Sequence, residues 1–196
     1  MRGVNGALIL VNVAAFALQL LYPGLLVPFA LWPLGAHTAA GLAARFEPWQ
    51  LVTYAFLHGG VAHLGLNMFA LWMFGRDCER ALGSARYLAL YFAAVLSAAA
   101  TQLAVASWAH ASYPTIGASG GVFGVLLAFA VLYPQRRIML LFPPIPMPAW
   151  LFVTLYGLIE LSNGVLGTDA GVAHFAHLGG MLGAGLMLRH WMRARR

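Results

Sequence analysis

Long apolar stretches alternate with short polar segments along the whole chain. Because a membrane-spanning helix needs about 20 mostly apolar residues, we expect an all-α, polytopic membrane protein with six transmembrane helices. Their approximate ranges are residues 4–22, 49–74, 86–109, 118–133, 148–166 and 172–191. The fourth stretch is shorter than a full span, so we expect its N-terminus to begin below the outer membrane surface.

Composition supports a single transmembrane domain over residues 1–196. The chain is 62% hydrophobic and 8% charged, whereas about a quarter of the residues of a soluble domain are charged. The single cysteine, Cys78, excludes an intrachain disulfide. We see no cleavable signal peptide, and a chain without targeting sequence or extra domains fits a bacterial inner membrane.

The basic residues recur in short clusters at every second loop. All 11 are arginines, and they give a net charge of +6. This spacing is typical of the positive-inside pattern and not of a nucleic-acid groove. We therefore expect both termini in the cytoplasm and no nucleic-acid partner. The clusters are Arg2; Arg76, Arg80 and Arg86; Arg136 and Arg137; and Arg189, Arg193, Arg195 and Arg196, with Arg45 outside them.

One serine lies where an external loop enters the fourth apolar stretch. Residues 116–121 read Ile-Gly-Ala-Ser-Gly-Gly, with the serine at Ser119. A helix N-terminus offers free backbone N–H groups and the positive end of the dipole, which suits a nucleophile whose intermediate carries a negative oxygen. A small-residue helix-packing motif is the other interpretation.

Two further stretches carry polar groups that are costly in a bilayer. In the sixth, His174 and His177 share a helix face beside a stripe of small residues, so one of them could act as the base for Ser119 if the fourth and sixth helices pack closely. In the second, His63 and Asn67 are four apart and could donate to an oxyanion. Interfacial histidines and an interhelical hydrogen-bonding pair are the structural alternatives.

Together these segments resemble the rhomboid family of intramembrane serine proteases. The second helix matches a His-x4-His-x3-Asn pattern at His58, His63 and Asn67. The fourth matches Gly-x-Ser-Gly at Gly117, Ser119 and Gly120, and the sixth matches Ala-His-x-x-Gly at Ala176, His177 and Gly180. Each motif is weak by itself, but three in order on the expected helices are specific, and the six-helix core covers nearly the whole chain.

The resemblance implies a role for each matching residue. Ser119 would attack the scissile carbonyl and His177 would act as general base and acid, while His63, Asn67 and the Ser119 backbone N–H form the oxyanion hole. His58 and His174 would be supporting histidines, and Phe123 would stack on the catalytic histidine. We expect no carboxylate near His177, no metal and no cofactor. Glu160, the only carboxylate deep within a span, is expected to be structural.

The resemblance also implies membrane-protein substrates that enter laterally in contact with lipid, with the fifth helix as a gate and residues 167–172 as a cap. Two positions depart from the family pattern: Gln50 stands where many relatives have Arg, and Ala184 where Gly is usual. The external segment 23–48 is still apolar, and either partial insertion in the membrane interface or an ordinary surface loop with a short helix explains it.

Three other interpretations remain open. A zinc-dependent hydrolase could use His58, His63, His174 and His177, although no His-Glu-x-x-His motif is present. A transporter or channel could line a path with the same polar residues, but its paired broken helices are not apparent. A non-catalytic, client-binding rhomboid relative would keep the fold without hydrolysis.

Overall fold

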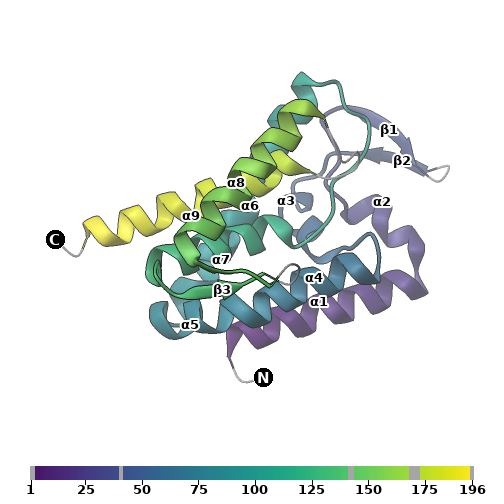
Figure 1. Ribbon diagram of the computed structural model, residues 1–196. Helices are drawn as coiled ribbons and strands as arrows, with labels where there is room; N and C mark the ends of the chain where they lie inside the picture. Colours follow the sequence, from purple (N-terminus) through teal and green to yellow (C-terminus); the bar gives the residue numbers. More distant parts are fainter. Residues whose placement is uncertain (1–2, 40–41, 141–143, 168–172, 195–196) are drawn as a thin grey trace.

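Helices of the computed structural model pack around one buried helix, α7 (Figure 1). The structure describes residues 3–39, 42–140, 144–167 and 173–194. The longer helices are α1 (Val4–Leu21), α4 (Val61–Ala70), α6 (Ser84–Trp108), α7 (Ser119–Leu132), α8 (Ala149–Leu166) and α9 (His174–Arg193). Shorter ones are η1 (Pro23–Leu25), α2 (Leu26–Phe29), α3 (Gln50–Thr53), η2 (Tyr54–Phe56) and α5 (Arg76–Leu82).

The second predicted helix, residues 49–74, has the wrong boundaries. Its first part forms α3 and η2, and the chain then breaks before α4 begins at Val61. The helix continues through the π-helical segment Leu71–Gly75 and α5 as far as Leu82. Gly59 and Gly60 explain the break because glycine is a poor helix former. The other predicted ranges lie close to α1, α6, α7, α8 and α9, although residue 172 lies outside the described part.

The all-α prediction also needs correction for two short hairpins. Strands β1 (Ala36–Ala39) and β2 (Leu42–Arg45) pair in antiparallel fashion within the expected external segment. Strands β3 (Arg137–Met139) and β4 (Pro146–Pro148) pair in the loop between α7 and α8. Prolines at both ends of β4 disfavour a helix there because proline lacks the backbone donor.

Helix α7 is buried along nearly all of its length. Side chains such as Val125, Ala128 and Phe129 are almost fully enclosed, and α6 and α9 are its main neighbours. The helix is apolar all round, as expected for a helix at the centre of a bundle. Its first residue, Ser119, is half-buried at the end of this helix.

Helix α1 carries a buried polar stripe that the sequence analysis did not single out. Asn5, Asn12 and Gln19 are seven residues apart and all buried. The Asn5 amide donates to the Leu71 carbonyl in the π-helical segment (2.9 Å), and the Gln19 side chain bonds both the N–H and the carbonyl of His58. Such bonds hold apolar helices together where hydrophobic burial cannot, and here they fix the chain that leads into α4.

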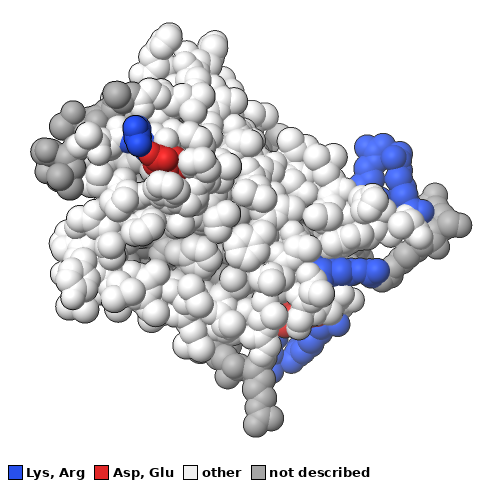
Figure 2. Space-filling view, turned by 180° about the vertical axis from the view of Figure 1, so that it is seen from behind, with Lys and Arg blue, Asp and Glu red and all other residues white. Residues whose placement is uncertain are grey.

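Charge separates the two ends of the molecule. In Figure 2 basic side chains gather at one end, a blue and red pair lies at the opposite end, and the surface between them is uncharged. The isolated pair is Arg45 with Glu47. We call the end formed by α5, the start of α1 and the end of α9 the basic end, and the end that carries β1 and β2 the hairpin end (Figure 1). The uncharged belt between them suits contact with lipid.

Glu79 fastens α1 at the basic end. Its carboxylate accepts hydrogen bonds from the backbone N–H groups of Val4 and Asn5 (2.8 and 3.0 Å) and from the Ser84 hydroxyl (2.6 Å). Partial burial would raise the pKa of this carboxyl, but these hydrogen bonds hold it below its ordinary value. A carboxylate at a helix N-terminus also complements the helix dipole.

The apolar belt identifies the chain as a multi-pass integral membrane protein. In the described part of the chain, α1, α6 and α8 are each long and apolar enough to cross a membrane, and α7 is a shorter apolar helix. Large apolar side chains such as Leu10, Leu20 and Leu158 are more than half exposed. A soluble protein rarely exposes so many in one continuous region, whereas lipid solvates them readily.

Candidate active site

Ser119 begins α7 at the end of a tightly held loop. The N–H of Gly117 donates to the Tyr54 carbonyl (2.9 Å), and Thr115 exchanges backbone hydrogen bonds with Leu31. Gly117 has φ 129°, and a Cβ there would lie 2.7 Å from Cε1 of His63. Both the backbone conformation and the space therefore require glycine at this position.

The structure brings Ser119 and His177 together. Oγ of Ser119 lies 2.8 Å from Nε2 of His177, although 58 residues separate them in sequence. The approach depends on two glycines, since a Cβ at Gly180 would overlap the backbone of Gly120. Two helices without Cβ atoms at their contact can come unusually close. This contact between α7 and α9 sets the distance between the serine and the histidine.

Phe123 fixes one face of the His177 ring. The two rings are stacked with centroids 4.3 Å apart and planes inclined by 5°. Phe123 comes from α7, one turn after Ser119, and it also contacts Tyr156 of α8. The stacking limits rotation of the imidazole, so Nε2 stays directed at the serine.

His63 and Asn67 lie on α4 as the sequence predicts. Gly59 donates its backbone N–H to Nδ1 of His63 (3.3 Å), which leaves Nε2 of His63 as the donor. This ring is packed against Gly117, two residues before Ser119. Asn67 is buried, and its amide nitrogen has no hydrogen-bond partner among the described residues. A buried amide donor without an acceptor is costly, unless a bound molecule supplies one.

His58 contacts His63 through its ring and Gln19 through its backbone. Its side chain is fully buried, and its ring lies edge-on to that of His63 with centroids 5.1 Å apart. The His58 backbone is bound to the side chain of Gln19 of α1. His58 therefore links the α1 polar stripe to His63.

The expectation that no carboxylate lies near His177 was wrong. Oε2 of Glu160 is 2.7 Å from Nδ1 of His177 and 2.8 Å from Nδ1 of His174. All three side chains are buried. Sequence reasoning placed Glu160 inside a span but could not tell which face of α8 it occupies. The sequence did offer one indication of this contact. A lone carboxylate in an apolar helix needs a polar partner.

The same three side chains have the composition of a metal site. Glu160, His174 and His177 are the one such group in the described part of the chain. One carboxylate oxygen lies at hydrogen-bonding distance from both Nδ1 atoms, so the three side chains are joined in a hydrogen-bonded chain. His58 and His63 are not part of it, and the four-histidine zinc alternative is thus not assembled.

Both departures from the family pattern have a structural explanation. Gln50 is buried, accepts a hydrogen bond from the Trp32 N–H (3.2 Å) and donates to the Arg45 carbonyl (3.0 Å). It therefore ties the hairpin-end segment together without a charge. Ala184 is fully buried, and its Cβ faces Gly124 of α7. The extra methyl group of Ala184 fits because the residue opposite it on α7 is a glycine.

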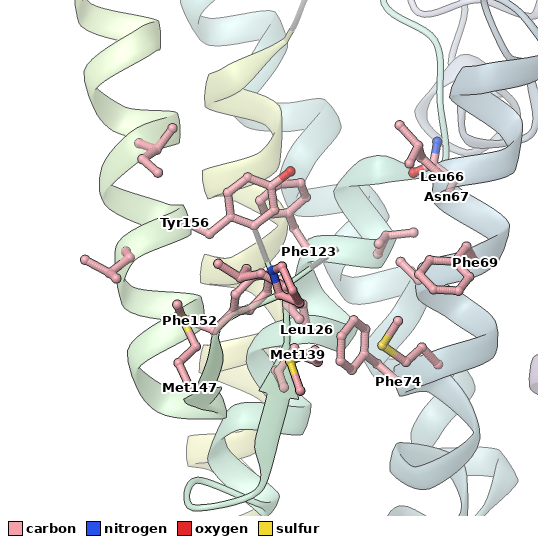
Figure 3. A pocket seen from close by; sticks show the side chains of 18 residues that line it. Leu66, Asn67, Phe69, Phe74, Phe123, Leu126, Met139, Met147, Phe152 and Tyr156 are labelled. Atoms are coloured by element: carbon pink, nitrogen blue, oxygen red, sulfur yellow. The ribbon is translucent and has the colours of Figure 1, made fainter. Parts of the chain in front are cut away.

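A cavity of about 800 Å³ opens between α4 and α8. In Figure 3, Phe152 and Tyr156 of α8 face Asn67 and Phe69 on the opposite wall, with Phe123 between them. Its lining is almost wholly apolar, and β3 residues contribute at the basic end. Phe123 lines this cavity and stacks on His177, so the cavity borders the serine–histidine pair.

The chain is similar in sequence to known proteins. A family model described as the Rhomboid domain matches residues 45–194. The chain is 33% identical over 142 residues to "Rhomboid protease GluP" of Bacillus subtilis, covering 72% of this chain and 26% of that protein. It is 33% identical over 142 residues to "Rhomboid protein 1, mitochondrial" of Saccharomyces cerevisiae, covering 68% and 39%. It is 32% identical over 155 residues to "RHOMBOID-like protein 4" of Arabidopsis thaliana, covering 73% and 35%.

The chain spans between about a quarter and two fifths of the length of these curated relatives. The family match covers α4 and α6 to α9, and thus every element that carries a site residue. With this extent of similarity, the chain belongs to the rhomboid family.

Proposed function

We propose that this protein is an intramembrane serine endopeptidase that cuts transmembrane segments of other membrane proteins. The observation that carries the proposal is the 2.8 Å approach of Ser119 Oγ to His177 Nε2 inside an apolar bundle. A serine hydroxyl is a weak nucleophile until a base within hydrogen-bonding reach accepts its proton. Membership of a family that includes a protein named as a protease adds to this support.

The proposed reaction has two steps. Ser119 Oγ forms a bond to the scissile carbonyl carbon while its proton passes to His177 Nε2. His177 then gives that proton to the leaving nitrogen as the C–N bond breaks, which leaves an acyl-serine. A water molecule, deprotonated by His177, attacks the acyl carbon, and the proton returns to Ser119 as the acid product departs.

Three donors would stabilise the oxyanion of each tetrahedral intermediate. They are the Ser119 backbone N–H, Nε2–H of His63 and the Asn67 amide. The backbone N–H belongs to the first residue of α7, so it has no partner within the helix. The Asn67 amide has none among the described residues. Donors that are already directed at the site need no reorganisation when charge develops there.

The apolar cavity between α4 and α8 is the proposed route for the substrate. Its lining would solvate an apolar transmembrane segment, and Phe123 in that lining stacks on His177. The segment must unwind locally because an intact helix hides its carbonyl groups, so poor helix formers near the cut favour cleavage. The proposed gate is α8. Of the predicted cap at residues 167–172, only Gly167 lies within the described residues.

The proposed topology has six crossings by α1, by α4 with its π-helical continuation, and by α6, α7, α8 and α9. The positive-inside rule then puts the basic end in the cytoplasm and the hairpin end outside. Ser119 begins α7 below the hairpin end, so water would enter from the external side. We assign the protein to a bacterial inner membrane on the sequence pattern alone.

Cleavage of a single-span reporter by purified protein tests the proposal. Wild type should cleave it, and Ser119→Ala and His177→Ala should each lower kcat by at least about 10³-fold. Activity that survives Ser119→Ala would exclude the serine mechanism. Thermal unfolding of each variant is the control for folding. A well-folded wild type that binds the reporter without cutting it would instead favour the client-binding alternative.

A further inference from the structure

Glu160 is a carboxylate that the reaction proposed above does not use. It lies on α8 among apolar neighbours, and only 6% of its surface is exposed. Burying an ionised carboxylate in a membrane protein is expensive unless it is paired and hydrogen-bonded. Both of its described partners are histidines of α9, and one of them is His177.

The hydrogen-bonding pattern decides which nitrogen of His177 can act as a base. An ionised carboxylate accepts hydrogen bonds and cannot donate them. If Glu160 is ionised, both Nδ1 atoms must therefore carry a proton. Nε2 of His177 is then the free acceptor, 2.8 Å from Ser119 Oγ. This is the tautomer that proton removal from the serine requires.

The same contact would serve the next step of the reaction. When His177 takes the serine proton it becomes a cation inside an apolar bundle, where unpaired charge is costly. The Glu160 carboxylate, 2.7 Å from Nδ1, lies close enough to compensate that charge. His174 holds the same oxygen from the other side at 2.8 Å, so the carboxylate keeps its position when the charge on His177 changes.

Given that the serine mechanism proposed above is correct, we propose that Glu160 is a positioning residue that fixes the tautomer of His177 and balances its charge, with His174 holding the carboxylate in place. Ser119, His177, Glu160 and His174 then form one hydrogen-bonded chain of four side chains on three helices. Further polar side chains near this chain include His63 of α4 and Tyr156 of α8.

If the carboxylate itself is needed, the variants of Glu160 should follow an order of activity that a packing role does not predict. Glu160→Gln preserves size but removes the charge, whereas Glu160→Asp keeps the charge on a shorter side chain. We expect Gln to lower kcat by about 10²–10⁴-fold, with KM changed less than about threefold, and Asp to retain more activity than Gln. Glu47→Gln, the same substitution in the exposed ion pair with Arg45, should leave kcat unchanged.

A second measurement avoids any change to Glu160. In wild-type protein labelled with ¹⁵N-histidine, the ring nitrogen signals of His177, assigned by their loss in His177→Ala, should show a proton on Nδ1. A proton on Nε2 alone at neutral pH would contradict the proposal even if the Glu160 variants fail to fold.

The outcomes separate this inference from the serine mechanism on which it rests. Cleavage that is abolished by Ser119→Ala but unchanged in Glu160→Gln would overturn the role of Glu160 alone. Gln that is as active as Asp, or more active, would overturn it too, because a filler of the right size would then suffice. Cleavage that persists in Ser119→Ala would overturn the serine mechanism instead. A kcat loss in Gln with partial recovery in Asp would support both.

Discussion

At the scale of single residues, the site consists of donors and acceptors that lack only a substrate. Asn67 exposes almost none of its surface, and its amide nitrogen finds no acceptor within the described part of the chain. The backbone N–H of Gly59 occupies Nδ1 of His63, so the opposite ring nitrogen is the one that can donate. In the proposed mechanism, the oxyanion that forms during the reaction would be the acceptor for this buried donor.

Replacement of Asn67 by Ala should therefore act on the chemical step. Loss of one oxyanion donor typically lowers kcat by about 10²–10³-fold, and because the donor acts mainly in the transition state, KM should change little. The measurement is steady-state cleavage of the single-span reporter, with the unfolding temperature as the control for folding. An unchanged kcat with a raised KM would show that Asn67 only binds the substrate.

Individual residues also show how far the sequence alone could lead. Ser119, His177, His63 and Asn67 could be selected because they are polar side chains in apolar stretches and match the three rhomboid motifs. The carboxylate contact of His177 could not, because it depends on the rotation of α8 about its axis. An apolar helix with lipid on one side and protein on the other has little periodicity to reveal that rotation.

At the scale of elements, the geometry of the site depends on two helices that touch through glycine. Gly120 of α7 and Gly180 of α9 leave no room for a Cβ at their contact. Membrane helices associate through close packing of small residues because lipid gives them little hydrophobic drive to pair. The serine and the histidine each lie within three residues of this contact, so any change in helix separation alters their distance.

Gly180→Ala should therefore separate the pair without touching either side chain. A displacement of about 1 Å can cost roughly 10²-fold in rate, and the added methyl group should cost about 1–3 kcal/mol of stability. Gly185→Ala on the same helix is the matched control, because its Cβ would meet only the end of the flexible Leu127 side chain at 3.4 Å. Equal activity of the two variants would contradict this account.

The bounds of the second predicted helix could not be derived from the sequence. Residues 49–74 are mostly apolar and carry no charged side chain, so hydrophobicity alone suggests one long span. The break before Val61 is set by two glycines and by the hydrogen bonds between Gln19 and the His58 backbone. The latter join positions far apart in sequence, which no local pattern indicates.

At the scale of the whole molecule, charge and apolar surface define an orientation. The ends of the described chain and α5 lie at the basic end, and β1 and β2 lie at the other (Figure 1). Composition and the spacing of arginines were enough to predict this separation. The short hairpins were not predictable, since strands of three or four residues leave too little pattern to detect.

The orientation can be measured by labelling cysteines in sealed vesicles. Ser112→Cys, in the loop before α7, and Arg193→Cys, at the end of α9, both place an exposed thiol outside the apolar belt. A membrane-impermeant maleimide should reach them from opposite sides of the membrane. Native Cys78 is fully buried and should stay unlabelled in the folded protein. Labelling of both positions from one side would contradict the six-crossing topology.

The most direct test of the central claim is reaction of the folded protein with a fluorophosphonate, followed by mass spectrometry of the modified peptide. This reagent captures a serine only when a neighbouring base has activated it. We predict one adduct, on Ser119, that disappears in His177→Ala while the fold is retained. Labelling that is unaffected by His177→Ala, or no labelling of Ser119 in well-folded wild type, would contradict the proposed serine–histidine pair.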